Sequence, residues 1–146
     1  MKKIKLINLA VLTLAVLTFG SCKKEGCTDT DETNYNESAK KDDNSCNYEG
    51  SVVLWYGQEV SDYLVNDDAI TLTYYVDGQI VGSSASSVYW TGSPSCGSNG
   101  SITITKDLSN AKNMSYTYRI IDQTGFEYWS GVLNFTANTC LAVELN

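Results

Sequence analysis

The chain has 146 residues and carries 10 Lys and Arg against 17 Asp and Glu, with no histidine. This length is enough for one domain, and the acidic excess excludes nucleic acid as a favoured partner because such a surface repels phosphates. The lack of histidine excludes a Ser-His-Asp triad and removes the commonest general base and metal ligand.

The N-terminal segment, residues 1–21, has the pattern of a secretory signal peptide. Three lysines form a basic start, an apolar run from Leu6 to Phe19 follows, and Gly20 and Ser21 close the segment. The run is shorter than the about 20 apolar residues that a membrane-spanning helix needs, which favours a signal over a permanent anchor. Because three of the ten basic residues lie in this segment, its removal leaves 7 against 17 acidic residues.

The sequence FGSC at residues 19–22 resembles the lipobox of bacterial lipoproteins, with Phe19 where leucine is usual. In that family small residues precede a cysteine that is acylated and becomes the mature N-terminus. The resemblance implies a lipid on Cys22 and an outer-membrane lipoprotein anchored in the cell envelope. The Lys-Lys-Glu that follows resembles an export signal to the cell surface, and a periplasm-facing protein is the alternative. Of the five cysteines, four then remain for two disulfides.

Residues 22–49 form an acidic and polar stretch with very few apolar side chains. Such a composition does not bury enough apolar surface to offset the entropy of ordering the chain. We therefore predict a tether at 22–49 and a single domain at 50–146.

Residues 26–46 of the tether read GCTDTDETNYNESAKKDDNSC. They resemble a short cysteine-bracketed module of secreted and surface proteins of Gram-negative bacteria, with Asn44 where that pattern usually has glycine. The resemblance implies a disulfide between Cys27 and Cys46, which would stabilise the loop by roughly 3 kcal/mol through the entropy of the unfolded chain. The matching residues are Gly26, Cys27, Thr28, Asp29, Asn34, Tyr35, Asn36, Ala39, Asp42, Asp43, Ser45 and Cys46.

The same loop contains a candidate calcium site. Asp29 and Asp31 alternate as calcium ligands do, but an EF-hand would need glycine and glutamate where the chain has Asn34 and Lys40. A site of another kind would use Asp29, Asp31, Asn34 and Asp42. The interpretation that we favour is a solvated spacer closed by a disulfide, so we assign no metal.

From Gly50 onward the sequence consists of β-branched and aromatic runs separated by Gly, Ser and Asn turns. Asp77-Gly78 joins two of these runs and is a strong hairpin signal. Several runs alternate apolar and polar side chains, as half-buried strands do, and no run has a convincing helical period. The predicted strands cover residues 51–56, 70–76, 79–82, 87–91, 101–105, 115–122, 126–136 and 141–145.

These short strands predict an all-β fold, an antiparallel β-sandwich of about seven to eight strands. Cys96 and Cys140 are the two cysteines of this region, and we pair them in an intradomain disulfide. A disulfide stabilises such a long loop most in theory. A metal site with two thiolates is the alternative, but without histidine they make a poor zinc set.

Four short motifs of this region resemble small sandwich domains of bacterial surface lipoproteins. They are the hairpin at Tyr75–Gly82, the turn at Pro94–Gly97, the strand motif at Trp129–Gly131 and Cys140 at the start of the last strand. The family is largely uncharacterised and structurally Ig-like or transthyretin-like. The resemblance therefore implies a fold and an address at the cell surface, without a function.

The sequence offers little for catalysis. It has no phosphate-binding glycine motif and no nucleophile elbow, so we predict no cofactor and assign no catalytic residue. Paired carboxylates of glycosidase type are the alternative, because Glu59, Asp62, Asp67 and Asp68 cluster in one segment. A small sandwich rarely frames a deep cleft, and the segment is interpreted more simply as a solvated connection. We predict that the protein is not an enzyme.

Ten tyrosines and three tryptophans exceed what a core of this size needs. Such rings stack on sugars and anchor protein interfaces when they are exposed. The alternative is that they pack across strands on a half-covered second face. The candidate ligand-stacking residues are Trp55, Tyr75, Tyr89, Tyr128 and Trp129, of which the first four fall opposite the core face predicted for their strands.

The predicted function is that of a non-enzymatic, lipid-anchored binding or adhesion-type accessory module of the cell envelope. Its partners would be the membrane, through the lipid anchor, and a glycan or an envelope protein. A carbohydrate-binding accessory lipoprotein in glycan uptake is one alternative. A structural subunit of an envelope complex is the other.

Overall fold

The computed structural model describes residues 23–146, which form seven β-strands and one α-helix. The predicted signal peptide and Cys22 lie outside the described residues. Within the described part, no helix combines the length and the apolar composition needed to cross a membrane. In chain order the elements are β1 (Tyr48–Trp55), α2 (Gln58–Asn66), β2 (Thr71–Val76), β3 (Gln79–Ala85), β4 (Ile102–Ser109), β5 (Asn113–Asp122), β6 (Glu127–Thr136) and β7 (Cys140–Glu144).

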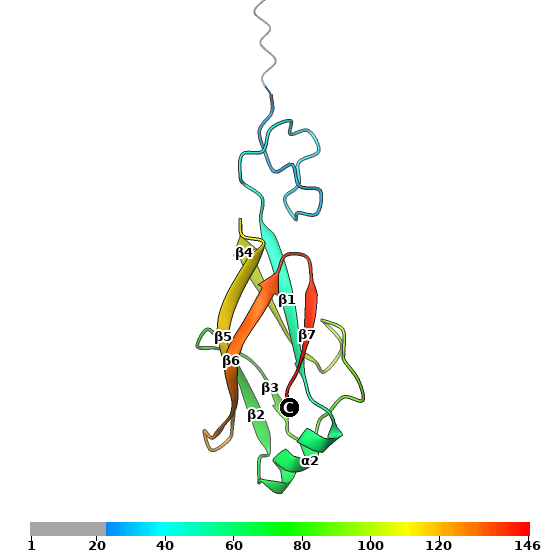
Figure 1. Cartoon of the computed structure of the whole chain (residues 1–146), viewed down its shortest axis with the longest axis vertical. Coiled ribbons are helices and arrows are strands. Elements are labelled where there is room, and N and C mark those ends of the chain that lie inside the picture. Colours follow the sequence, from blue (N-terminus) through cyan, green and yellow to red (C-terminus); the bar gives the residue numbers. More distant parts are fainter. Residues whose placement is uncertain (1–22) are drawn as a thin grey trace, which may run out of the picture.

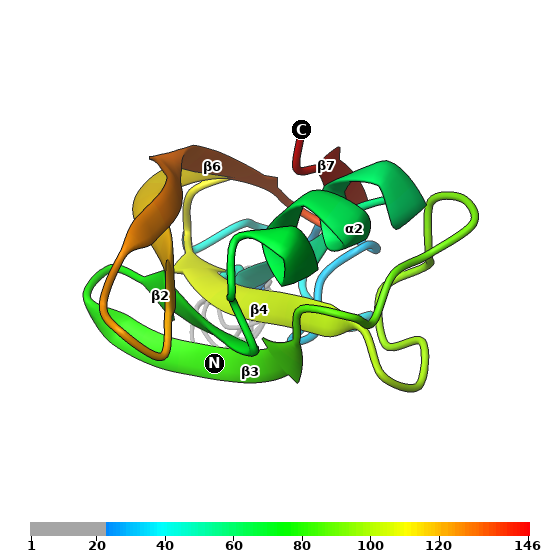
Figure 2. The ribbon, with the colours of Figure 1, turned by 90° about the horizontal axis from the view of Figure 1, so that it is seen from below.

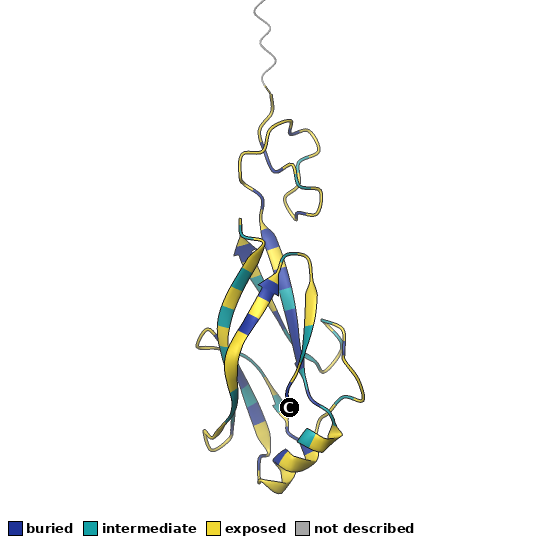
Figure 3. Cartoon of the chain, viewed as in Figure 1, coloured by how far each residue is buried: buried dark blue, intermediate teal, exposed yellow. Residues whose placement is uncertain are grey.

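Two sheets pack as a β-sandwich, which confirms the predicted all-β fold (Figure 1). One sheet has three strands in the order β4-β1-β7, and the other has four in the order β3-β2-β5-β6. The predicted hairpin at Asp77-Gly78 joins β2 to β3. Side chains from both sheets form one apolar core (Figure 3). Its fully buried members include Val52, Leu72, Val76, Leu108, Ile120, Leu133 and Phe135.

The predicted alternation holds for β2, in which Leu72, Tyr74 and Val76 are buried. Ile70 is predicted on the same face, but it precedes β2 and is 70% exposed. Its N–H donates a hydrogen bond to the Gln123 side chain instead of to a neighbouring strand. The strand therefore begins one residue later than the sequence pattern predicts.

One strand pair corrects the prediction of a wholly antiparallel sandwich, because β7 pairs with β1 in parallel. The chain changes sheets between β6 and β7, and β7 therefore enters beside the start of β1. Asn138 N–H donates to the Glu49 carbonyl and Ser51 N–H to the Thr139 carbonyl. Gly50 permits this approach, since a Cβ at that position would lie 2.7 Å from the carbonyl oxygen of Thr136.

The segment interpreted as a solvated connection is in fact the helix α2, which lies across one end of the sandwich (Figure 2). Ser61 and Leu64 are buried, and Val60 packs against the core. The remaining residues of the helix are exposed. Only one narrow stripe of this nine-residue helix is therefore buried, and the hydrophobic residues Tyr63 and Val65 lie outside it. This weak periodicity explains why the sequence pattern did not predict a helix.

The predicted strand at 87–91 is not formed, since residues 86–101 connect β3 to β4 without a strand. This connection is held to the sandwich by the N–H of Trp90, which donates to the Tyr56 carbonyl, and by a disulfide between Cys96 and Cys140. This backbone hydrogen bond and the disulfide therefore hold the connection in place without strand pairing. The predicted pairing of the two cysteines is confirmed, with 5.9 Å between their Cα atoms.

Candidate binding groove

An open groove of about 610 Å³ lies between α2 and the start of β6. Its volume is in the range of ligand-binding clefts in proteins. The groove is at the end of the molecule opposite the N-terminal cysteine loop, residues 23–47 (Figure 1). Its walls include Glu59 and Tyr63 from α2, and Phe126, Glu127, Tyr128 and Trp129 from β6 and the turn before it.

Four rings of the groove form an aromatic cluster with Tyr128 at its centre. Tyr63 meets Tyr128 edge to face at 6.5 Å between ring centroids, and Phe126 does so at 5.0 Å. Trp129 lies 5.8 Å from Tyr128 and stacks on Tyr56 at 6.2 Å. Tyr63 and Phe126 are 60% and 58% exposed, so much of their apolar surface remains available to a partner.

Tyr128 links the two walls of the groove through its hydroxyl, which donates a hydrogen bond to Asp67 at 2.7 Å. Asp67 follows directly after α2, so this bond joins the end of the helix to β6. Partial burial and the bond to the Asp67 carboxylate raise the pKa of Tyr128 above its ordinary value. The tyrosine therefore stays a hydrogen-bond donor at neutral pH.

The turn that presents Phe126 is shaped by Asp122, which ends β5 and is buried. One oxygen of its carboxylate accepts hydrogen bonds from Thr124 N–H at 2.8 Å, Thr124 Oγ1 at 2.7 Å and Phe126 N–H at 2.9 Å. Burial opposes ionisation of Asp122, but these bonds favour the charged form and hold its pKa below the ordinary value. Phe126 is thus exposed on an ordered turn.

A buried hydrogen-bond network, centred on Ser86, holds α2 against the sandwich. Ser86 follows β3, and its carbonyl oxygen accepts from Ser61 Oγ at 2.8 Å and from the Tyr56 hydroxyl at 3.2 Å. The Ser86 hydroxyl donates to the Ala69 carbonyl, and its N–H donates to the Ile70 carbonyl. All polar groups of Ser86 are thereby paired, and the network fixes where α2 lies.

Two of the five aromatic residues predicted to stack on a ligand, Tyr128 and Trp129, lie in the groove. The other three lie elsewhere. Trp55 ends β1 in the three-stranded sheet, Tyr75 belongs to β2 in the four-stranded sheet, and Tyr89 is in the connection at 86–101. The structure therefore does not bring the five rings together.

Sequence reasoning missed Tyr63 and Phe126, the most exposed rings of the aromatic cluster. Tyr63 lies in α2, which the sequence pattern does not predict. Phe126 precedes β6, although the pattern predicts a strand from residue 126. A signal for α2 was available in the spacing of Val60 and Leu64, which are four residues apart and both pack against the core. Reading that spacing as helical would have placed Tyr63, three residues after Val60, at the border of the core-facing stripe, and its exposure depends on the tertiary structure.

The four carboxylates considered for catalysis do not form one lining set. Glu59 lies in the groove wall, and Asp67 is bound to Tyr128 beside it. Asp62 and Asp68 are exposed and are not part of the wall.

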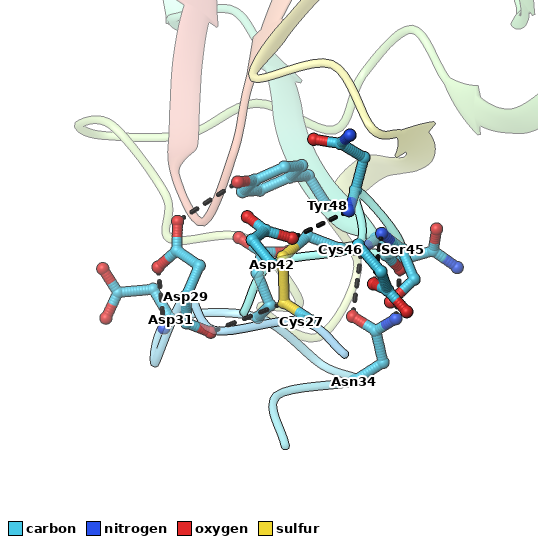
Figure 4. Close-up of a disulfide and its surroundings, with 12 residues drawn as sticks. Cys27, Asp29, Asp31, Asn34, Asp42, Ser45, Cys46 and Tyr48 are labelled. Atoms are coloured by element: carbon cyan, nitrogen blue, oxygen red, sulfur yellow. Dashed lines mark hydrogen bonds between the residues drawn. A yellow bond between two sulfur atoms is a disulfide. The ribbon is translucent and has the colours of Figure 1, made fainter. Parts of the chain in front are cut away.

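The cysteine loop contains the second predicted disulfide, between Cys27 and Cys46, whose Cα atoms are 4.8 Å apart. Asp29 and Asn34, two of the candidate calcium ligands, point to opposite sides of this bond (Figure 4). Asn34 binds the chain near Cys46, since its side-chain nitrogen donates to the Ser45 carbonyl and its oxygen accepts from Asn47 N–H. These amide atoms therefore close the loop.

Asp29 and Asp42 are also occupied by contacts within the chain, whereas Asp31 takes part only through its backbone N–H. Asp29 accepts hydrogen bonds from the Tyr48 hydroxyl at 3.1 Å and from Lys112 Nζ at 3.0 Å, and also from Asp31 N–H. Asp42 accepts a hydrogen bond from Asn44 N–H. Among the described residues no group of three or more Asp, Glu or Cys is arranged to hold a metal ion.

The cysteine loop is attached to the sandwich, since Tyr48 is the first residue of β1 and Lys112 directly precedes β5. Cys27 and Cys46 are buried in the same cluster as the core of the sandwich. Glu32 is also buried at this contact, and one of its carboxylate oxygens has no hydrogen-bond partner within the described chain. Such an unpaired polar atom is costly.

No family model, no curated protein and no solved structure matches the chain. The resemblances of the cysteine loop and of the sandwich to lipoprotein families therefore stay predictions. A function must be argued from the geometry and chemistry of the groove itself.

We predict that Glu32→Gln raises the free energy of unfolding at neutral pH. Burial, with the nearby Asp29 carboxylate, raises the pKa of Glu32. A raised pKa means that protonated Glu32 favours the folded state, and that this stability is lost as the pH rises through the folded-state pKa. The advantage of the variant should therefore shrink when urea unfolding is measured near about pH 4. The exposed Glu37→Gln is the control, and an equal gain there would contradict the explanation.

Ser86→Ala should lower the free energy of unfolding by about 1–3 kcal/mol, because it removes a buried donor to the Ala69 carbonyl. Ser87→Ala is the matched control, since Ser87 is the adjacent serine and is exposed. Chemical denaturation measures both. Equal stability of the two variants would show that the Ser86 hydroxyl does not stabilise the segment that follows α2.

Proposed function

We propose that the protein is a non-enzymatic binding module, anchored by a lipid on Cys22 in the bacterial cell envelope, that uses the groove between α2 and β6 to hold a partner. The observation that carries the proposal is the aromatic cluster, in which Tyr63 and Phe126 are exposed on ordered elements. Exposed aromatic side chains on a rigid scaffold are typical anchors of binding surfaces.

The position of the groove supports this role. The described chain begins in the cysteine loop, and the groove is at the opposite end of the long axis of the molecule (Figure 1). An anchor at Cys22, one residue before the described part, would therefore direct the groove away from the membrane. The outer membrane and a surface-exposed orientation are part of the proposal, with a periplasm-facing orientation as its alternative.

A carbohydrate-binding accessory in glycan uptake is a second candidate. It is favoured by the combination of exposed rings with the polar side chains of Glu59 and Glu127 in one groove, since sugars present both apolar faces and hydroxyl groups. The third candidate, a structural subunit of an envelope complex, would use the same surface against a protein. Binding to a glycan array favours the former, and co-purification with an envelope protein without glycan favours the latter.

The anchor is tested by the intact mass of the protein isolated from its own membrane. We expect a chain that begins at Cys22, carries acyl groups there, and has lost four thiol hydrogens to two disulfides. Cys22→Ser should keep the disulfides and appear without acyl groups. Free thiols in the exported protein, or an unmodified N-terminus upstream of Cys22, would contradict this part of the proposal.

The groove is tested by surface plasmon resonance of the mature protein against glycan and protein fractions of the envelope of its host. We expect binding to at least one fraction, weakened at least about tenfold by the double variant Tyr63→Ala and Phe126→Ala. The control removes two exposed apolar side chains elsewhere, through Ile80→Ala and Val88→Ala. Equal losses in both double variants, or no binding to any fraction, would refute the role of the groove.

A further inference from the structure

The charges around the groove are all negative. Glu59 and Glu127 belong to its wall, and Asp67 is bound to Tyr128 at its edge. The helix α2 has no basic residue. An anionic ligand would be repelled from this end of the molecule, whereas a cationic one would be attracted.

The cations of the described chain are placed elsewhere. Four lysines belong to the cysteine loop, Lys112 is paired with Asp29 of that loop, and Lys106 lies opposite Gly50 near the start of β1. Arg119 stacks on Tyr75, with its guanidinium carbon 4.6 Å from the ring centroid. None of these seven residues belongs to the wall of the groove. Arg119 and Glu127 line a neighbouring pocket on the four-stranded sheet, but within the described chain no ion pair joins a cation to Glu59, Asp67 or Glu127.

The chain itself shows how a tyrosine and a carboxylate bind a lysine. At the cysteine loop, the Tyr48 hydroxyl donates to Asp29, and Lys112 Nζ binds Asp29 at 3.0 Å while lying 5.1 Å from the centroid of the Tyr48 ring. Both the carboxylate and the face of the ring attract the ammonium group.

The groove contains a pair of the same kind, because the Tyr128 hydroxyl donates to Asp67 at 2.7 Å. Here the rings of Tyr63 and Phe126 stand edge to face with Tyr128 and add further aromatic faces. The pair thus has the chemistry of the Tyr48–Asp29 pair, with more aromatic surface and without a lysine of its own.

We propose that the groove binds a basic segment of a partner protein, with a Lys or Arg side chain lying on the aromatic cluster and its charged group held by Glu59 and Glu127. This inference rests on the proposed function and names the chemistry of the partner. A polypeptide fits an open groove because the long stems of Lys and Arg cover apolar surface while their heads reach carboxylates. Several cations in one segment also use Glu59, Glu127 and Asp67 together.

Pentalysine amide with a fluorescent label is the probe, and its binding to the mature protein in non-ionic detergent is measured by fluorescence anisotropy. Binding should weaken as ionic strength increases. Tyr63→Ala should weaken it about threefold to tenfold, as expected for loss of one cation–π contact. The double variant Glu59→Gln and Glu127→Gln should weaken it by about tenfold or more.

The charge-matched control is the double variant Glu37→Gln and Asp77→Asn, which removes two exposed carboxylates outside the groove. It should change the affinity less than about twofold. Pentalysine with acetylated side chains keeps the backbone and should not bind. The proposal is overturned if the acetylated peptide binds equally well, if the control loses as much affinity as the groove variant, or if pentalysine does not bind at low ionic strength.

A neutral oligosaccharide, cellopentaose, separates this inference from the proposed function. If cellopentaose binds and Tyr63→Ala weakens that binding while pentalysine does not bind, the groove remains a binding site and the cationic partner is refuted. If pentalysine binds but is insensitive to both Tyr63→Ala and the Glu59 and Glu127 substitutions, it binds another surface, and the inference is also refuted. The result expected is binding of pentalysine alone.

Discussion

The position of α2 depends on the pairing of one buried serine, and the groove depends on α2. Ser86 directly follows β3, and its carbonyl oxygen receives hydrogen bonds from Ser61 of the helix and from Tyr56, which directly follows β1. An unpaired group at this buried position would cost free energy, so the three elements can meet in few ways. Leu64 adds a fully buried apolar contact from the same helix. Together they set Tyr63 beside Tyr128 and create a wall that the sandwich alone does not have.

The exposure of the groove is not a consequence of poor packing. The ring of Trp129 stacks on Tyr56, and its indole N–H donates a hydrogen bond to the main-chain oxygen of Asn146. Tyr128 is fastened through Asp67, and Asp122 orders the turn that ends in Phe126. The rings are therefore held by specific bonds while Tyr63 and Phe126 leave most of their surface to solvent. A fold that only needed to cover its core would not require this arrangement.

Much of the fold was predictable from the sequence because strands with one buried face have a period of two. The strands β2 and β6 and the Asp77-Gly78 hairpin are predicted by local residues. The Cys96–Cys140 disulfide followed from the count and placement of the cysteines, whereas the Cys27–Cys46 disulfide was implied by the resemblance to a cysteine-bracketed module. The parallel pairing of β7 with β1 was not predictable in this way, since it depends on where the chain changes sheets near Gly50. The groove was predicted only in part, through Tyr128 and Trp129. Its other wall comes from a helix in which only a narrow stripe packs against the core, and contacts between distant segments put that wall in place.

The distribution of charge carries more information than the net charge. The composition of the chain shows an acidic protein, and the fold places five of the seven described cations, the four lysines of the cysteine loop and Lys112, at the end opposite the groove. Lys112 joins the cysteine loop to the sandwich through Asp29, so this cation is used in holding the structure together. At the other end Glu59, Asp67 and Glu127 surround exposed rings without a basic residue in the wall. Within the described chain, none of these three carboxylates forms an ion pair with a lysine or arginine. The interaction that attaches the cysteine loop and the interaction that we propose for a partner are therefore the same chemistry, completed within the chain at one end and left open at the other.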